Sequence, residues 1–271
     1  MLFCSIREKA SNWAPFVFLS FSFFTSSTLL AANCSPNTFE ETVTVSYVYD
    51  GDTIKLSDGR KLRLIGVNTP ERGRDGKADE PFYLAAKQHL EKIIELNNHQ
   101  VKLITGKEKH DRYQRLLAHI FTKDNKNISE DIIRNGLGYM ISIAPNLHFL
   151  SCYQQAEQQA KSQQRGFWNH SFSKSISITQ LNKSINGFHV ITGSVKRIGE
   201  SRSAFWLNLK TPSNYKFALR IAKKNLDFFT RFQPSSLLGK NISARGWVYK
   251  VKNEQRINIH HPASLEILST D

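Results

Sequence analysis

The sequence predicts a mainly β protein with added helices, built from two small five-stranded barrels. The chain has 271 residues, and hydrophobic residues make up 40% of it, enough for packed cores. Twice along the chain, three strand-like alternating runs precede a helix-like run and two further strand-like runs. Five strands in this order are typical of an OB-type barrel carrying helices, so the predicted class is α+β with two such barrels.

The first set of elements begins with the alternating run of residues 41–66. Asp58-Gly59 interrupts this run and is a strong signal for a two-residue hairpin turn. Residues 79–96 have the amphipathic pattern of a helix, and a short helix capped by Asn127 or Ser129 follows later. Two more strands and a helix at 147–165 complete a predicted domain over residues 33–168.

The second set follows a polar, serine-rich stretch, residues 169–184, which is the predicted linker. Strand-like patterns return after it, and the helix-like run "KKNLDFFTRF" separates the third from the fourth. Residues 185–271 therefore predict a second OB-like domain, an architecture often used to bind nucleic acid. A β-rich domain that only adds packing or stability is the alternative.

The first 32 residues read as a secretory signal peptide. Arg7 and Lys9 precede a stretch, residues 10–39, that carries no charge, and small residues surround the expected cleavage position near Ala32. A membrane anchor is the alternative, but Pro15 breaks the apolar run. We therefore expect a periplasmic or secreted protein with no stable membrane association after cleavage.

The cysteines fit an exported chain. Cys4 would leave with the signal peptide, which leaves Cys34 and Cys152 as an even pair. In an oxidising compartment such a pair predicts a disulfide. Two separate buried thiols are the alternative reading, and a lipid attachment at Cys34 is disfavoured because Asn33 precedes it.

The charge of the chain points to a polyanionic partner. Lys and Arg number 37 against 23 Asp and Glu, which gives a formal net charge of +14. Nucleic acid and an anionic membrane surface are the two partners that such a balance favours. A basic surface without a specific partner is the remaining possibility.

Spacing around the predicted hairpin gathers one group of polar residues. A two-residue turn at Asp58-Gly59 sets Ile54 opposite Arg63 and makes Arg63 the diagonal neighbour of Asp52. Asn68, Thr69 and Glu71 follow at the far end of the second strand. Oxygen ligands beside an arginine suit a hard cation bound together with a phosphate, whereas the alternative is a surface ion pair.

A second group lies in "DRYQRLLAHI", residues 111–120. Tyr113 and Arg115 share one face there, while Leu116 and Ala118 point the other way. A guanidinium for phosphate and a ring for a base suit a nucleotide. A solvated strand face is the alternative.

Together these motifs resemble the staphylococcal nuclease (thermonuclease) family. "DGDTIKL", "RLIGVNTPE" and "DRYQRLLAHI" occur in the family's order, and "GLGYM" and "AEQQAKSQQRGFW" extend the resemblance over roughly residues 41–168. The resemblance implies a calcium-dependent phosphodiesterase that cuts DNA, RNA or both with little sequence preference. It also implies cleavage of the bond to the 5′ oxygen, which leaves 3′-phosphates.

The resemblance implies three metal ligands. Asp52 matches the family's first calcium carboxylate, and Thr69 matches the threonine whose backbone carbonyl binds the metal. Asn68 departs from the pattern, because the type member has an aspartate at this position. An amide oxygen still ligates calcium but lacks the negative charge, so metal affinity is the property most affected.

The resemblance also implies catalytic and substrate-binding residues. Arg63 and Arg115 match the two arginines that bind the reacting phosphate. Glu71 matches the glutamate that activates or positions the attacking water. Arg112 and Tyr113 match contacts to the substrate phosphates, with Arg112 where the type enzyme has a lysine.

A non-catalytic nucleic-acid-binding module on the same fold, with a weakened metal site at Asn68, is the second hypothesis. The presence of Asp52, Arg63, Glu71 and Arg115 favours the enzyme, because a decayed site would more readily have lost one of them.

Overall fold

The computed structural model describes Met1 and residues 34–73, 75–169, 175–181, 183–212, 215–230 and 233–268. The chain divides into one unit of residues 1–31 and another of residues 32–271, and every helix and strand below belongs to the second unit. Apart from Met1, the predicted signal peptide lies outside the described residues. Within them, no helix combines the length and the apolar character needed to cross a bilayer.

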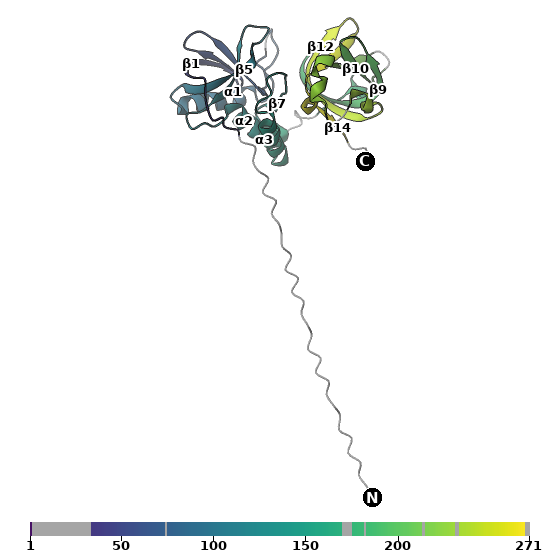
Figure 1. The fold of residues 1–271 in the computed structure, drawn as a ribbon, viewed down its shortest axis with the longest axis horizontal. Helices are drawn as coiled ribbons and strands as arrows, with labels where there is room; N and C mark the ends of the chain where they lie inside the picture. The colour runs from purple at the N-terminus through teal and green to yellow at the C-terminus, as the bar shows by residue number, and fades with distance from the viewer. Residues whose placement is uncertain are drawn as a thin grey trace. The chain divides into compact units, whose positions relative to one another are not determined.

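The first barrel, whose strands β1 and β5 are labelled in Figure 1, closes in the order β1-β2-β3-β6-β5. Its strands are β1 (Glu41–Asp50), β2 (Thr53–Leu56), β3 (Lys61–Leu64), β5 (Gln100–His110) and β6 (Leu116–Phe121). The β3–β6 pair is parallel and the other four pairs are antiparallel. Ile54, Leu62, Leu103 and Ile120 are fully buried in its core. The predicted OB-type barrel is confirmed.

Three helices and a small second sheet accompany this barrel: α1 (Tyr83–Leu96), α2 (Ile128–Arg134), α3 (Leu150–Ser162), and β4 (Val67–Asn68) paired with β7 (Tyr139–Met140). Helix α1 begins later than the pattern predicts, because Phe82 has a left-handed φ of 70° that a helix interior does not allow. Of the two candidate caps of α2, Asn127 is the one used, since its side chain accepts a hydrogen bond from Glu130 N.

The second barrel repeats the strand order of the first. Its five strands close as β9-β10-β11-β13-β12, with β12 returning to β9. They are β9 (Gly187–Glu200), β10 (Ala204–Leu209), β11 (Lys216–Ala222), β12 (Asn241–Val251) and β13 (Glu254–Ile259). The third and fifth strands, β11 and β13, again run parallel. The predicted second OB-like barrel is therefore confirmed.

Two details of this half differ from the sequence-based expectation. The helix-like run that begins at Lys223 forms only a short 3₁₀ segment, η4 (Lys223–Phe228), and a second one, η5 (Pro234–Leu237), follows. Residues 169–184 are not wholly a linker. Within them β8 (Ile176–Ser177) pairs with β9, and Ile178 and Leu181 are buried in the second core, because apolar side chains there complete the barrel's packing.

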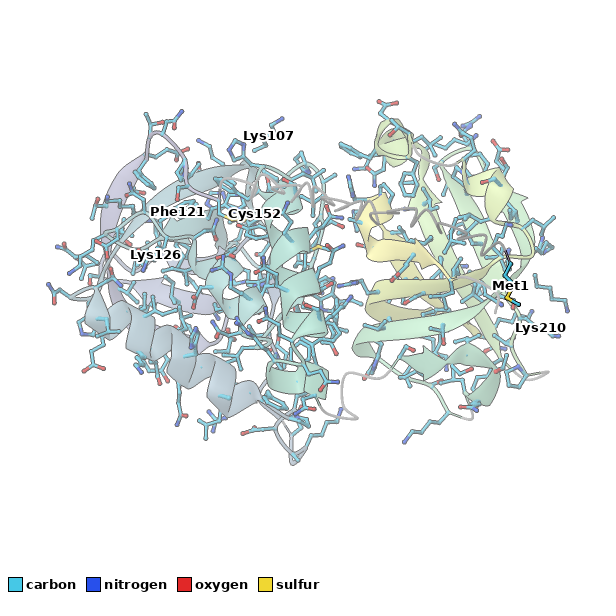
Figure 2. All side chains as sticks on the ribbon, turned by 90° about the horizontal axis from the view of Figure 1, so that it is seen from below. Met1, Lys107, Phe121, Lys126, Cys152 and Lys210 are labelled. Carbon is cyan, nitrogen blue, oxygen red and sulfur yellow. A yellow bond between two sulfur atoms is a disulfide. The ribbon has the colours of Figure 1, made fainter. Side chains whose placement is uncertain are left out.

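The remaining elements are short. They are the strand β14 (Leu265–Ile267), paired with β12, and the 3₁₀ segments η1 (Gly166–Asn169), η3 (Ile178–Gln180) and η6 (Pro262–Ser264). Cys34 and Cys152 form a disulfide that attaches the residues before β1 to helix α3, on which Cys152 is labelled in Figure 2.

Candidate active site

The β2–β3 hairpin positions the first group of site residues, and its register differs from the prediction. Leu56 N donates to Arg60 O, and Gly59, at a left-handed φ of 93°, donates to Leu56 O. The loop therefore has three residues, with glycine in the left-handed position that such loops require. Thr53, and not Ile54, lies opposite Arg63. The prediction of a two-residue turn was wrong by one position.

Asp52 and Arg63 meet despite this shift. Arg63 Nη2 lies 3.0 Å from Asp52 Oδ2, and the two residues are 7% and 1% exposed. Asp52 stands just before β2 begins, so its side chain is not held to the alternation of that strand. The pair is thus a buried ion pair rather than the surface pair that the sequence left open.

The guanidinium of Arg63 donates hydrogen bonds to backbone oxygens at the end of its own strand. Nη1 donates to the backbone oxygens of Leu64 and Val67, at 3.0 and 2.9 Å. Nη2 donates to Asn68 Oδ1 at 3.1 Å as well as pairing with Asp52. Both terminal nitrogens therefore act within the protein here. A phosphate that binds Arg63 must share or replace these partners.

Thr69 and Asp52 bind each other closely. Asp52 Oδ2 accepts hydrogen bonds from Thr69 N at 2.7 Å and from Thr69 Oγ1 at 3.0 Å, and Asp52 Oδ1 accepts one from Thr53 Oγ1. Gly51 makes this approach possible, since a Cβ added there would lie 2.7 Å from Thr69 Cγ2. The glycine of "DGD" is therefore a packing requirement of the site.

Asp50 is a site residue that our reading of the sequence missed. Its Oδ1 accepts a hydrogen bond from Asp52 N, so the two aspartates stand together at the β1–β2 turn. Burial first, and then the negative charge of Asp52, raise the pKa of Asp50 to about 7. The sequence shows only two aspartates separated by one residue at a strand end, which does not reveal the burial that shifts the pKa of Asp50.

The second predicted group is organised by Asp111. Its Oδ2 accepts from Arg115 Nε at 2.6 Å, and its Oδ1 accepts from the backbone nitrogens of Tyr113 and Arg115. Burial alone would raise the pKa of Asp111, but the hydrogen bonds from Arg115 outweigh burial and hold that pKa below its ordinary value. Asp111 therefore remains charged and fixes the direction of Arg115.

Arg112 and Tyr113 lie at the surface of the same loop, before β6 begins, so the predicted strand face shared by Tyr113 and Arg115 is wrong. Tyr113 is 63% exposed, and Arg112 Nη2 donates to its hydroxyl at 2.7 Å. The guanidinium of Arg112 lies 4.7 Å from the centre of the ring. An exposed ring with an adjacent guanidinium suits contact with a base and a phosphate of a nucleic acid. This arrangement favours a nucleic-acid contact over a merely solvated surface.

The parallel pairing of β3 with β6 relates the two groups. Leu62 pairs with Leu116, and Arg63 pairs with Leu117. Arg115 lies immediately before β6 and so adjoins Leu116, and Arg63 faces the side of β3 opposite to Leu62. Leu62, Leu116 and Ala118 point into the core on the other side.

Glu71 follows the first group along the chain. Its side chain is exposed, its backbone nitrogen donates to Glu80 Oε2, and its backbone oxygen accepts from Glu80 N. The buried Pro70 separates it from Thr69. The structure thus brings Asp50, Asp52, Arg63, Asn68 and Thr69 into direct contact and sets Glu71 at the exposed edge of that cluster.

Buried oxygen donors beside Arg63 on an OB barrel suit a phosphodiester-cleaving enzyme of the nuclease class. The family model described as "Staphylococcal nuclease homologue" matches residues 61–170. A Thermonuclease of Staphylococcus hyicus is 31% identical over 160 residues, which cover 58% of this chain and 93% of that protein. The chain belongs to the staphylococcal nuclease family, and it is a nuclease that acts on nucleic acid.

Two further relatives agree with this assignment. A Thermonuclease of Staphylococcus intermedius is 32% identical over 131 residues, 47% of this chain and 76% of that protein. The Endonuclease YncB of Bacillus subtilis (strain 168) is 30% identical over 149 residues, 54% of this chain and 67% of that protein. These similarities decide for the enzyme and against the non-catalytic module.

Proposed function

We propose that this nuclease is a calcium-dependent phosphodiesterase that hydrolyses both DNA and RNA with little sequence preference and leaves 3′-phosphates. The observation that carries the proposal is the buried cluster of Asp52, Arg63, Asn68 and Thr69, in which oxygen donors and a guanidinium converge at one strand end. We assign catalysis to residues 33–168.

The donor set of this cluster fits calcium. The carboxylates of Asp50 and Asp52, the amide oxygen of Asn68 and the backbone carbonyl of Thr69 are all hard oxygen ligands. Burial first, and then the negative charge of Asp52, raise the pKa of Asp50, and a divalent cation bound beside these carboxylates would favour their ionised forms. When bound, the ion neutralises charge on the phosphodiester and orients a water molecule.

The protein's own groups account for the rest of the chemistry. Arg63 on β3 and Arg115, just before the paired strand β6, both donate to the nonbridging oxygens as negative charge builds on the phosphate. Asp111 positions Arg115 for this role through the hydrogen bond to Nε. Arg63 must shift its Nη2 from Asn68 Oδ1 toward the phosphate.

Glu71 takes or directs the proton of the attacking water. A carboxylate does this best when it borders the cluster and is reached by solvent, which is the position that Glu71 occupies after Pro70. Arg112 and Tyr113 hold a neighbouring phosphate, because their side chains project together from the exposed loop after β5.

We also propose that the protein acts outside the cytoplasm, in the periplasm or the medium. The charge-free stretch near the N-terminus and the disulfide between Cys34 and Cys152 support export to an oxidising compartment. No stable attachment to the membrane is expected once residues 1–32 have been removed.

The test is digestion of plasmid DNA and of RNA by purified protein, with calcium and then with a chelator. Cleavage of both polymers with calcium alone is expected. The products should accept a 5′ label from polynucleotide kinase without prior phosphatase treatment, because their phosphates remain at the 3′ ends. Activity that survives the chelator, or products with 5′-phosphates, would contradict the proposal.

A further inference from the structure

The outer face of the second barrel carries a row of aromatic and basic side chains across four strands. Trp206 on β10 lies opposite Arg220 on β11, and Arg256 on β13 lies opposite Tyr249 on β12. On the inner side of the same strands, Leu207, Leu219, Val248 and Ile257 are buried in the core. Alternation along the strands therefore forces these four larger polar and aromatic residues outward.

Contacts among these side chains hold the indole ring in place. The guanidinium of Arg256 lies 4.5 Å, and that of Arg220 5.7 Å, from the centre of the Trp206 ring. Trp206 Nε1 donates to Ser201 Oγ at 3.3 Å. An indole with two adjacent guanidinium groups offers flat surfaces for stacking as well as positive charge for phosphates.

The charge of this face is positive on balance. Beside Trp206 lies a hollow of about 290 Å³ whose charged lining residues are Arg197, Glu200, Glu254 and Arg256. Each carboxylate has a cation of its own, since Glu254 pairs with Arg256 and Glu200 pairs with Lys223. Arg197 and Arg220 add to these cations, so a polyanion meets a net attraction.

A groove connects this face with the nuclease domain. A hollow of about 750 Å³ is lined by Arg112 from the loop between β5 and β6 and by Arg220, Tyr249 and Asn258 from the second barrel. Arg220 thus borders both the groove and the Trp206 ring. Positive charge continues from the loop beside the active site to the row on the barrel.

We propose that this groove and the row of Trp206, Arg220, Tyr249 and Arg256 bind the unpaired strand of a nucleic-acid substrate beyond the scissile phosphate. The inference rests on the proposed function, because it adds a second binding surface for the same substrate. A single strand is the occupant because a base stacks on an indole only when it is not paired within a duplex. The nuclease therefore binds long unpaired strands more tightly than short fragments.

The experiment measures binding of fluorescent single-stranded oligonucleotides to the full-length protein, with a chelator present to prevent cleavage. An OB barrel covers about 4–16 nucleotides, so strands of about 6 and about 30 nucleotides distinguish one surface from two. The wild type should bind the longer strand more tightly. Trp206→Ala should bind the longer strand about tenfold more weakly, which corresponds to the loss of one stacked base. Trp206→Phe should keep most of the wild-type affinity.

Charge removal supplies an independent variant. For the longer strand, Arg220→Gln combined with Arg256→Gln should reduce the log–log slope of binding against salt by about 0.7 for each phosphate that is no longer neutralised. Lys92→Gln, on the exposed face of α1, is the matched control and should bind as the wild type does. Melting temperatures of all variants identify any that fail to fold.

The outcomes that overturn the inference are distinct from a failure of the proposed function. Equal affinity of the wild type, Trp206→Ala and the double arginine variant for the longer strand would remove the surface from substrate binding. A preference of the face for duplex, unaffected by Trp206→Ala, would also overturn it. The binding assay contains no calcium. Its result can therefore be interpreted even if the enzyme proves to need another metal for catalysis.

Discussion

Arg245 Nη1 binds both carboxylate oxygens of Glu157, at 2.6 and 2.7 Å. The pair joins β12 of the second barrel to α3 beside the first, and both side chains are largely buried. Glu157 Oε1 also accepts from Met140 N on β7, next to the strand that carries Asn68. The second barrel is therefore attached to the sheet that positions the site.

The first prediction concerns the loss of Arg245. Arg245→Met should lower the free energy of unfolding by about 3–5 kcal/mol at neutral pH, because it leaves the buried carboxylate of Glu157 with Lys161 as its remaining cation. Chemical denaturation measures this loss. The double variant Arg245→Met/Glu157→Gln should recover part of it, and a double variant no more stable than the single one would contradict the account.

The pairing of Arg245 with Glu157 also makes the destabilisation by Arg245→Met depend on pH. Burial opposes ionisation of Glu157, but Arg245 and Lys161 outweigh burial and hold the pKa of Glu157 below its ordinary value. A carboxyl group whose pKa is lowered by folding stabilises the protein at pH values above its pKa in the unfolded chain. This stabilisation is lost as the pH falls through the pKa of the folded state. Without Arg245, burial raises the pKa instead, so the destabilisation by Arg245→Met should be smaller at about pH 4 than at about pH 7.

The second prediction concerns Asn68. Asn68→Asp adds a negative charge among the proposed calcium ligands, and it should lower the calcium concentration for half-maximal activity by about tenfold. Asn68→Ala should raise that concentration, because it removes an oxygen that Arg63 now holds. Calcium titrations of activity are the measurement. Unchanged calcium curves with lowered melting temperatures would make Asn68 a purely structural residue of the β4–β7 pair.

The third prediction separates turnover from binding. Glu71→Gln should lower kcat by about 10²–10⁴-fold, the usual contribution of a general base, while the affinity for DNA stays near that of the wild type. Single-turnover rates and equilibrium binding measure the two quantities. An equal loss of both would instead assign the Glu71 side chain a structural role.

The fourth prediction concerns the buried His119. Its Nδ1 lies 2.7 Å from the Tyr153 hydroxyl, and burial first, then the charge of His148, lowers the pKa of His119 to about 3. The unfolded chain therefore takes up this proton before the folded one does, and stability falls as the pH drops below about 6.5.

His119→Gln should remove that slope. The loss reaches at most about 1.4 kcal/mol per pH unit for one proton, so the stability difference between the wild type and His119→Gln should shrink between about pH 6.5 and pH 4. Denaturant titrations across this range are the measurement. His110→Gln, at an exposed position, is the control and should keep the wild-type slope.

The sequence predicted the fold more accurately than the details of the site. Two-residue alternation and the order of elements were enough for both barrels, because inward and outward side chains differ along every strand. The exact register was not accessible, since a loop of two or three residues at Asp58-Gly59 depends on the backbone angle of Gly59. A shift of one residue changed the partner of Arg63 from Ile54 to Thr53.

Other features of the site depend on contacts far apart in the chain. Alternation alone does not reveal that Arg63 is buried and shared between Asp52 and Asn68, because β4 is placed by its pairing with β7. Asp50 was missed for a different reason. Its importance comes from burial beside Asp52, and a sequence pattern carries no information on burial of a polar residue at a strand end.

The parallel pair within each barrel has a consequence for the order of folding. In the first barrel Leu62 must find Leu116 across a stretch that contains α1 and β5. In the second, Phe217 finds Gln255 across a shorter stretch whose described residues form β12 and two 3₁₀ segments. Contacts between residues closer in sequence form sooner, because less chain entropy is lost before they are made. The barrel synthesised last should therefore be the faster to fold. In refolding of a full chain in which every other tryptophan is replaced by Phe, the fluorescence of Trp206 should recover before the enzyme regains activity.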